Sequence, residues 1–203
     1  ASAAAPILYI AALLAGKCPV FINWTAGPRA LEHAVRQLDV RTVVTARALV
    51  QKLERQGVDL APLRNRLAFL EDWRAAVSWQ RKVWAAARAR FGRLPPDPAA
   101  APDPAAVLFT SGSEALPKAV PLTHAQLLAN LRDLLAVFPV RADDRFLGLL
   151  PPFHSFGLTV TVLLPLLAGI PVVYHPVPTE GGRLARLLAG WRATLLAATP
   201  TFL

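Results

Sequence analysis

Short apolar runs typical of β-strands alternate with helical segments along almost the whole chain of 203 residues. This alternation predicts βαβ units, in which each helix connects two neighbouring strands of a mostly parallel sheet. The expected strands span residues 19–23, 41–46, 67–72, 106–110, 118–123, 144–151, 170–175 and 193–199. The expected helices span residues 7–16, 28–38, 47–57, 73–93, 124–138 and 182–191, with another that ends at Gly169. We therefore expect an α/β fold with mostly parallel sheets packed by helices.

A proline- and alanine-rich segment divides this pattern into two parts. Five of the 19 prolines lie between residues 95 and 104, and such a composition favours an extended linker. We therefore predict a first α/β part at residues 1–94, a linker at residues 95–105 and a second α/β part at residues 106–203. The second part contains the stretch richest in small polar residues.

That stretch, VLFTSGSEALPKAVPLTH at residues 107–124, places hydroxyl groups between two expected strands. Thr110, Ser111 and Ser113 can donate hydrogen bonds, and Gly112 lets the backbone approach a ligand closely. Successive backbone N–H groups can form an anion-binding nest. These features favour a loop that is shaped around an anion.

Lys118 adds a compact positive charge that suits a phosphate. The stretch is not the P-loop sequence GxxxxGK[ST], because Ala119 and an expected strand follow the lysine. From these residues alone two interpretations stay open, a phosphate-binding loop and an ordinary polar turn.

Three motifs resemble signatures of the adenylate-forming enzymes, the superfamily of acyl-CoA synthetases, luciferases and peptide-synthetase adenylation domains. FTSGSEALPKAVPLTH resembles the phosphate-binding signature, LPPFHSFGLT resembles a second signature downstream, and LLAGKCPVFINWTAG resembles a third upstream. Within the superfamily, the chain is most similar to the acyl-ACP synthetases that are joined to a 2-acylglycerophosphoethanolamine acyltransferase. The resemblance covers essentially the whole chain, and it implies an internal piece of the large N-terminal domain.

The resemblance implies an ATP-dependent, AMP-forming acid–thiol ligase. A fatty acid carboxylate attacks the α-phosphate of ATP, pyrophosphate leaves, and the acyl group of the acyl-adenylate passes to a thiol. That thiol belongs to acyl carrier protein (ACP) or CoA, and the implied role is phospholipid acyl recycling.

The resemblance also assigns site residues. The ATP phosphates are expected on Thr110, Ser111, Gly112, Ser113, Glu114 and Lys118. The catalytic residue is expected to be His154, with Phe153 and Phe156 on the carboxylate and acyl side. Fixed donors and a cation suit these roles, since they stabilise charge that develops on the departing pyrophosphate. The Mg²⁺ ligand is expected beyond Leu203, so no metal site is expected within the chain.

Two alanines depart from the phosphate-binding signature. Ala115 and Ala119 stand where the family usually has glycine, and each methyl group restricts φ and opposes closure of the loop. The adenine-binding segment, the hinge and the C-terminal catalytic lysine of the family are also absent, so we expect this chain alone to be inactive. A second interpretation stays open, a non-catalytic, degenerate adenylation-like module that acts as a binding or scaffold domain.

Residues 73–93 carry a basic pattern without any acidic residue. Two sets recur every seven residues, an apolar set (Val77, Trp84 and Phe91) and a basic set (Arg74, Arg81 and Arg88). This spacing predicts one helix with a basic stripe beside an apolar one. Such a helix fits contact with an anionic membrane surface or an acidic protein. The alternative is a surface helix whose tryptophans pack on the domain.

Charge and hydropathy exclude some classes of protein. The net charge is +9, but no nucleic-acid-binding motif accompanies it, so we expect no nucleic-acid partner. Residues 156–174 carry no charge, yet Pro165, Gly169 and Pro171 interrupt the run, which favours a buried helix and strand over a membrane span. Cys18 is the only cysteine, so no intrachain disulfide forms. We expect a cytoplasmic protein, with contact to the inner face of the cytoplasmic membrane left open.

Overall fold

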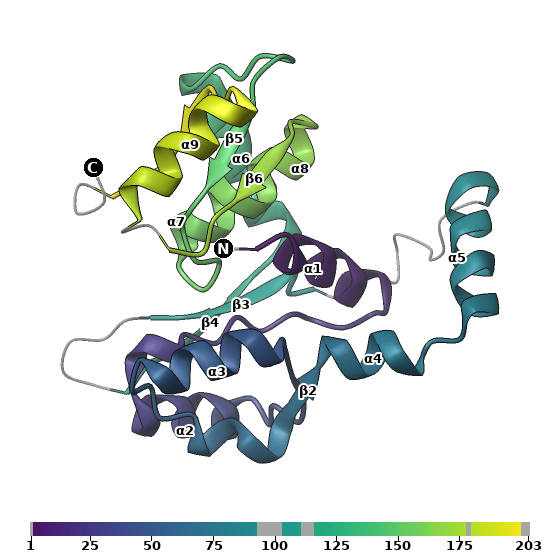
Figure 1. Cartoon of the computed structure of the whole chain (residues 1–203). Helices are drawn as coiled ribbons and strands as arrows, with labels where there is room; N and C mark the ends of the chain where they lie inside the picture. The colour runs from purple at the N-terminus through teal and green to yellow at the C-terminus, as the bar shows by residue number, and fades with distance from the viewer. Residues whose placement is uncertain (1, 93–102, 111–115, 178–179, 200–203) are drawn as a thin grey trace. The chain divides into compact units, whose positions relative to one another are not determined.

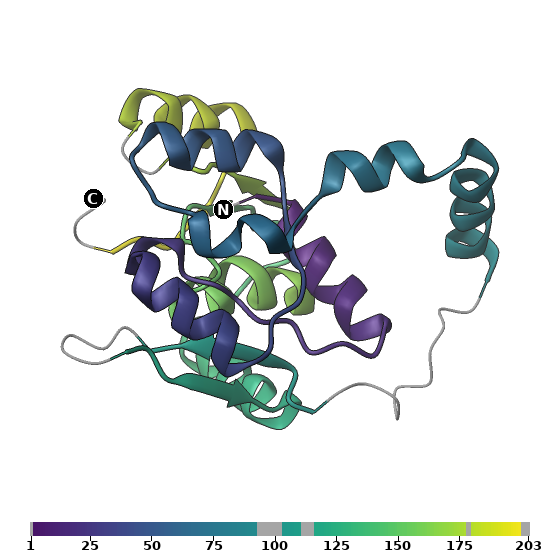
Figure 2. The same cartoon turned by 90° about the horizontal axis from the view of Figure 1, so that it is seen from below.

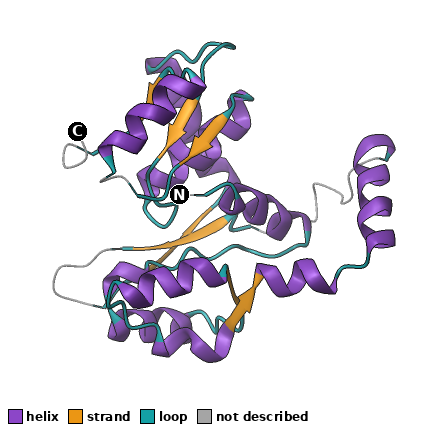
Figure 3. Cartoon of the chain, in the orientation of Figure 1, coloured by secondary structure: helices purple, strands orange, loops and turns teal. Residues whose placement is uncertain are grey.

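The computed structural model of the chain describes residues 2–92, 103–110, 116–177 and 180–199. The chain divides into two compact units. One unit comprises Ala1–Phe21, Ala100–Leu108 and Val120–Leu203, and the other comprises Ile22–Ala99 and Phe109–Ala119. Helices and strands occur in both, as Figure 3 shows, so the α/β prediction is confirmed. The boundaries at residues 94 and 105 stay predictions, because most of the linker lies outside the described residues.

The unit that contains residues 22–99 is built on a pair of parallel strands. β1 (Val43–Thr45) and β2 (Leu67–Phe69) pair in register, and α2 (Pro28–Gln37) and α3 (Arg47–Arg55) lie beside them (Figures 1 and 2). Short 3-10 turns precede α2 and β2, at Trp24–Ala26 and Ala61–Arg66. The core of this unit consists of Leu31, Val35, Leu53, Leu60 and Leu63.

The other unit contains a three-stranded parallel sheet. β5 (Phe146–Gly148) is the central strand and pairs with β6 (Val172–Tyr174) on one side and β7 (Leu195–Leu196) on the other. On one face, Leu147 packs with Leu184 of α9 (Gly181–Trp191). On the opposite face, Phe146 packs with Leu134 of α6 (His124–Val137).

Two further strands, β3 (Ala106–Phe109) and β4 (Ala119–Leu122), form a hairpin. The N–H of Ala105 donates to the carbonyl of Leu122 at 2.8 Å, and that of Thr110 donates to the carbonyl of Lys118 at 3.0 Å. Partner numbers fall along one strand as they rise along the other, so the hairpin is antiparallel. The other two sheets are parallel, as the sequence pattern predicts.

The strand predicted at residues 19–23 is wrong in extent. Only an isolated parallel bridge joins Val20 to Val107. Pro19 has no N–H to donate, and Asn23 instead accepts from the N–H of Thr25 at 3.0 Å, which starts a 3-10 turn. Local capping therefore ends the extended segment early.

The uncharged stretch at residues 156–174 folds as predicted, into helix followed by strand. α7 (Ser155–Leu158), a π-helical turn (Thr159–Leu163) and α8 (Leu164–Ala168) follow one another. The helix ends at Gly169, whose φ of 69° is the left-handed conformation that glycine adopts without strain. Among the described helices, none is long and apolar enough to cross a membrane.

The single helix predicted at residues 73–93 is wrong, because the structure has two helices there (Figure 3). α4 (Leu70–Ala76) ends before an extended Val77, and α5 (Trp79–Phe91) begins after Ser78. The Ser78 hydroxyl accepts from the N–H of Arg81 at 3.4 Å, which makes Ser78 the N-cap of a new helix.

This break separates the three arginines of the predicted basic stripe. Arg74 lies on α4, whereas Arg81 and Arg88 lie on α5. The alternative, in which the tryptophans pack on the domain, is also wrong, because Trp73, Trp79 and Trp84 are all exposed. The strand predicted at residues 67–72 is also wrong in extent, because β2 ends at Phe69 and α4 begins at Leu70.

A hydrogen-bonded junction ties the start of β5 to the start of β7. Asp144 is only 8% exposed, and its carboxylate accepts from the Thr194 hydroxyl at 2.6 Å and from the N–H of Arg141 at 2.7 Å. The Thr194 oxygen in turn accepts from the N–H of Arg145 at 3.0 Å. The bond from Thr194, followed by that from Arg141, lowers the pKa of Asp144, although burial opposes the shift.

We predict a pH-dependent effect of Asp144→Asn on stability. Since the folded-state pKa is lowered, the ionised carboxylate stabilises the fold above its unfolded pKa of about 3.9, and this contribution is lost as the pH falls through the folded pKa. Asp144→Asn should lower the urea midpoint at neutral pH, and the difference from the parent chain should shrink toward pH 3. Equilibrium unfolding at both pH values checks this, and a constant difference would contradict it.

Candidate active site

The two ends of the loop at residues 110–118 are joined by a pair of hydrogen bonds. The N–H of Thr110 donates to the carbonyl of Lys118 at 3.0 Å, and the N–H of Lys118 donates to Oγ1 of Thr110 at 3.0 Å. This pair closes the neck of the loop between β3 and β4. It therefore fixes where the loop leaves the hairpin and where it returns.

The Lys118 side chain is exposed at this neck. In the described part of the chain, no acidic group forms an ion pair with its ammonium. The Thr110 oxygen accepts from the backbone of Lys118, and its own O–H stays able to donate to a ligand. Thr110 thus combines a structural role with its predicted role in phosphate binding.

Four of the predicted phosphate-binding residues lie outside the described residues. They are Ser111, Gly112, Ser113 and Glu114. Their roles stay predictions, as does the effect of Ala115. Pro117, next to the neck, is buried, and its ring fixes φ just before Lys118.

His154 lies in the loop that follows the carboxyl end of β5. Its backbone N–H donates to the carbonyl of Pro151 at 3.3 Å, and its carbonyl accepts from the N–H of Leu158 at 2.8 Å. His154 is the N-cap residue of α7. The imidazole is exposed, so it is accessible at the edge of a parallel sheet where α/β proteins commonly bind ligands.

The two phenylalanines beside His154 differ in burial. Phe153 is 3% exposed, and its ring centroid lies 4.6 Å from that of the imidazole. Phe156 is 49% exposed, which leaves half of its ring accessible. Phe153 therefore supports the imidazole from within the core, whereas Phe156 offers an apolar surface on the outside. The predicted contact of both rings with an acyl chain stays a prediction.

Three residues that the sequence analysis missed hold this loop in place. Gly157 approaches the Pro151 carbonyl so closely that a Cβ would overlap its oxygen. The Thr161 hydroxyl bonds the carbonyls of Leu150 and Gly157, and Tyr174 donates to the Thr161 carbonyl at 2.8 Å. In the sequence, only the presence of Gly157 and Thr161 within an aliphatic run could have indicated this role. Burial raises the pKa of Tyr174, which keeps its hydroxyl protonated as a donor.

No group of three or more His, Cys, Asp or Glu side chains in the described residues could hold a metal ion. The buried His175, at the end of β6, places Nε2 at 3.2 Å from Oε2 of Glu180, without hydrogen-bond geometry. These two residues do not make a metal site. The predicted Mg²⁺ ligand stays an expectation for other parts of the protein.

The structure thus brings together Thr110 with Lys118, and Phe153 with His154. The first pair lies on the loop between β3 and β4, and the second lies beyond β5. These positions agree with the motifs that resemble those of the adenylate-forming enzymes. The chain belongs to the AMP-binding enzyme family, whose sequence profile matches residues 1–203.

Curated relatives are acid ligases. The chain is 30% identical over 156 residues to 4-coumarate–CoA ligase-like 9 of Oryza sativa subsp. japonica. The aligned region covers 76% of this chain and 27% of the relative. The chain is 42% identical over 97 residues to medium-chain fatty-acid–CoA ligase of Escherichia coli, covering 47% of this chain and 17% of the relative. It is 43% identical over 54 residues to long-chain-fatty-acid–[acyl-carrier-protein] ligase AEE15 of Arabidopsis thaliana, covering 27% and 7%.

Solved structures share the fold. O-succinylbenzoate–CoA synthetase of Bacillus subtilis in complex with its acyl-adenylate has a TM-score of 0.73 and 15% identity, covering 100% of this chain and 48% of that chain. Its complex with ATP and magnesium has a TM-score of 0.72 and 17% identity, covering 100% and 38%. The chain thus spans less than half of these proteins. None of these relatives supports membrane contact through Arg74, Arg81 and Arg88.

We predict that Gly157→Ala destabilises the chain, because the added methyl group would force the Pro151 carbonyl and the His154 loop apart. Overpacking of this kind costs about 1–3 kcal/mol. The matched control is Gly190→Ala in α9, where a Cβ meets nothing within 4 Å. That change should stabilise the chain by about 0.5 kcal/mol, since alanine favours helix. Urea unfolding measures both, and equal midpoints for the two variants would contradict the close approach at Gly157.

Proposed function

We propose that this chain is part of an AMP-forming acid–thiol ligase that activates a fatty acid. The observation that carries the proposal is the closed neck of the loop at residues 110–118, in a chain that the AMP-binding family matches throughout. At the neck, the backbone N–H of Lys118 donates to the Thr110 hydroxyl oxygen, and the two side chains are proposed to meet phosphate oxygens. The proposed reaction forms an acyl-adenylate and pyrophosphate from the fatty acid and ATP.

The fatty acid substrate is proposed from two relatives. One is named as a medium-chain fatty-acid–CoA ligase and the other as a long-chain fatty-acid–[acyl-carrier-protein] ligase. Since the second name specifies a carrier-protein thiol, we propose ACP as the acceptor, with CoA as the alternative. The proposed role is acyl recycling in phospholipids, in the cytoplasm, as in the acyl-ACP synthetases joined to an acyltransferase.

His154 is proposed to meet the carboxylate. Its exposed imidazole lies against Phe153, and its backbone is fixed by bonds to Pro151 and Leu158, so the ring can donate to a carboxylate oxygen from a defined position. Phe156 lies two residues away with half of its ring accessible. It can contact the first methylene groups of an acyl chain while the imidazole holds the head group.

ATP and Mg²⁺ are the proposed cofactors, and the B. subtilis relative was solved with both. The described residues suit the phosphates, because an exposed cation and a hydroxyl donor share one neck. Bound Mg²⁺ would supply further neutralisation of phosphate charge. No ligand for it is assigned to the described residues.

We predict that Lys118→Ala weakens nucleotide binding by about 10-fold, because one charge-assisted contact to the phosphates is lost. Calorimetric titration of the chain with ATP and with pyrophosphate measures the binding, and pyrophosphate–ATP exchange in the full-length protein measures adenylation. The matched control is Lys82→Ala, which removes the same charge from an exposed position on α5. Equal affinities for the two variants would overturn the assignment of Lys118.

A second candidate function is a non-catalytic module, and Ala115 and Ala119 are the residues that favour it. If their methyl groups restrict the loop, Ala115→Gly with Ala119→Gly should increase the rate of pyrophosphate–ATP exchange in the full-length protein several-fold. Should the parent protein itself show no exchange while the double glycine variant does, the natural chain acts as a degenerate module. An unchanged rate in an active protein means that the loop works with its alanines.

A further inference from the structure

Three exposed aromatic side chains lie along α5. Every residue from 71 to 92 is exposed, and Trp79, Trp84 and Phe91 are 70%, 60% and 85% exposed. Soluble proteins rarely leave such a concentration of large apolar side chains in water without a binding role. The helix therefore has a face that no described part of the chain covers.

The apolar side chains of α5 occupy one sector of the helix. With about 100° per residue, Trp79, Val83, Phe91 and Trp84 fall within about 140° of the circumference. Arg81 and Arg88 flank this sector on one side and Lys82 flanks it on the other, while Arg90 lies inside it. Gln80 also lies inside it. Long cationic side chains that border apolar ones are a feature α5 shares with interfacial helices.

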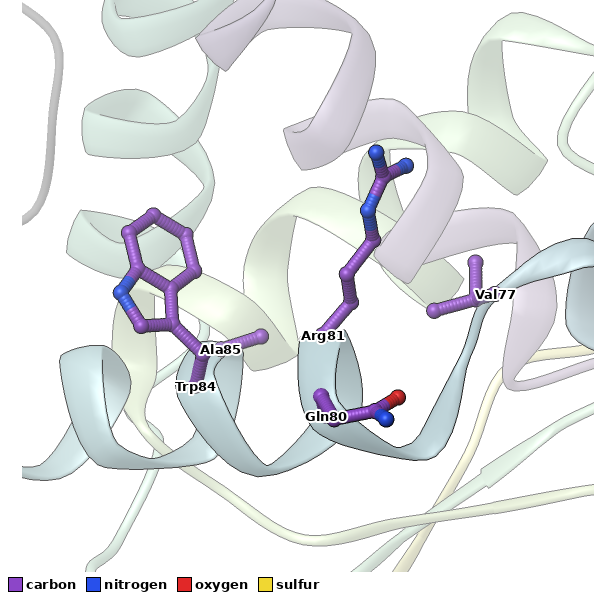
Figure 4. A pocket seen from close by; sticks show the side chains of 5 residues that line it. All are labelled: Val77, Gln80, Arg81, Trp84 and Ala85. Carbon is purple, nitrogen blue, oxygen red and sulfur yellow. The ribbon is translucent and has the colours of Figure 1, made fainter.

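Cations and aromatic rings are adjacent on this surface. Figure 4 shows Arg81 and the Trp84 indole directed to the same side of α5, beside Val77. The guanidinium carbon of Arg88 lies 4.7 Å from the Trp84 ring centroid, and that of Arg90 lies 5.5 Å from the Phe91 centroid. A guanidinium placed over a ring keeps its N–H groups free to meet phosphate oxygens.

Among the described residues, the acidic side chains that precede α5 do not neutralise these cations. Residues 73–92 include no Asp or Glu. Glu71 and Asp72, at the start of α4, bond Arg47 instead, through its backbone N–H at 2.9 Å and its guanidinium at 2.6 Å. The charged side chains of α5 itself are therefore all positive, and they complement an anionic surface.

We propose that α5 binds the surface of a membrane that contains anionic phospholipids. Tryptophan favours the depth of the lipid headgroups, where its ring is buried and its N–H stays hydrated. Cations on both sides of one apolar sector can reach headgroup phosphates while the rings enter between the lipids. An acidic protein would also complement these cations, but exposed aromatic side chains bordered by cations favour a lipid interface. The proposal does not depend on nucleotide binding. It leaves out Arg74, which lies on α4, and includes the aromatic residues of α5.

The experiment uses the 203-residue chain and two kinds of vesicle. One kind is phosphatidylcholine alone, and the other contains three parts phosphatidylcholine to one part phosphatidylglycerol. Co-sedimentation gives the partition coefficient, and a blue shift of tryptophan emission reports entry of the indole rings into the lipid. We expect binding and a blue shift with the anionic vesicles only, both weakened when salt is raised from about 0.1 M, because screening shortens the range of the charges.

Three variants make the test specific to α5. Arg81→Gln with Arg88→Gln should weaken partition by about 10- to 30-fold, as expected for two cations at an anionic surface. Trp84→Ser with Phe91→Ser should reduce both binding and blue shift, and all four side chains are exposed, so the fold should survive. The matched control is Arg29→Gln with Arg132→Gln, which removes two exposed charges from α2 and α6 and should bind like the parent. Circular dichroism verifies folding of each.

Three results would overturn the proposal. They are no partition to the anionic vesicles, equal partition of the α5 arginine variant and the control variant, and saturable binding to acidic ACP without binding to vesicles. The last result would assign the surface to a protein partner. None of these results depends on ATP, so the proposed ligase function would stand or fall separately.

Discussion

The pairing of β5 with a parallel strand on each side determines the geometry of the unit that contains His154. Leu147 has no exposed surface and packs against α9, while Phe146 packs toward α6. A strand that is buried on both faces and bonded at both edges has a fixed register and direction. The loop that follows therefore leaves at a fixed point, and two features refine it: the close approach of Gly157 to Pro151 and the bonds from Thr161 and Tyr174. The position of the imidazole is a consequence of this packing.

Elements with a strong hydrophobic period were predictable from the sequence, whereas breaks set by single capping residues were not. The helices α2, α3, α6 and α9 and the strands of the parallel sheets lie where the alternation places them. The sequence of residues 73–93 keeps a period of seven across the break at Val77 and Ser78, since a heptad count does not register two extended residues. Ser78 needs only its hydroxyl and an extended backbone to start a new helix. Periodicity reports buried faces, and capping depends on one side chain.

The residues of the candidate site also fall into two groups, those that the sequence could predict and those that it could not. His154 and Lys118 could be selected because their chemistry is rare in an aliphatic chain and each stands in a motif. Two hydrogen bonds could not be predicted, since each joins residues that only the folded backbone brings within reach. They are the bond from Lys118 to the Thr110 oxygen and the bond from Tyr174 to the Thr161 carbonyl. Asp144 and Thr194, 50 residues apart in sequence, are a further case. Sequence motifs identify the candidate site residues, whereas tertiary structure identifies the residues that keep them in position.

In the two proposed roles, positive charge acts in two physically different ways. Lys118 is a single cation at a neck fixed by hydrogen bonds, so it can meet a phosphate without much reorganisation, and its contribution depends on position. The cations of α5 are exposed and their action on a distant surface falls with salt, so their contribution depends on number. The two uses complement each other in the proposed function. A fatty acid partitions into lipid, so a ligase whose exposed helix lies on an anionic membrane surface meets that substrate at a higher local concentration than it would in bulk water.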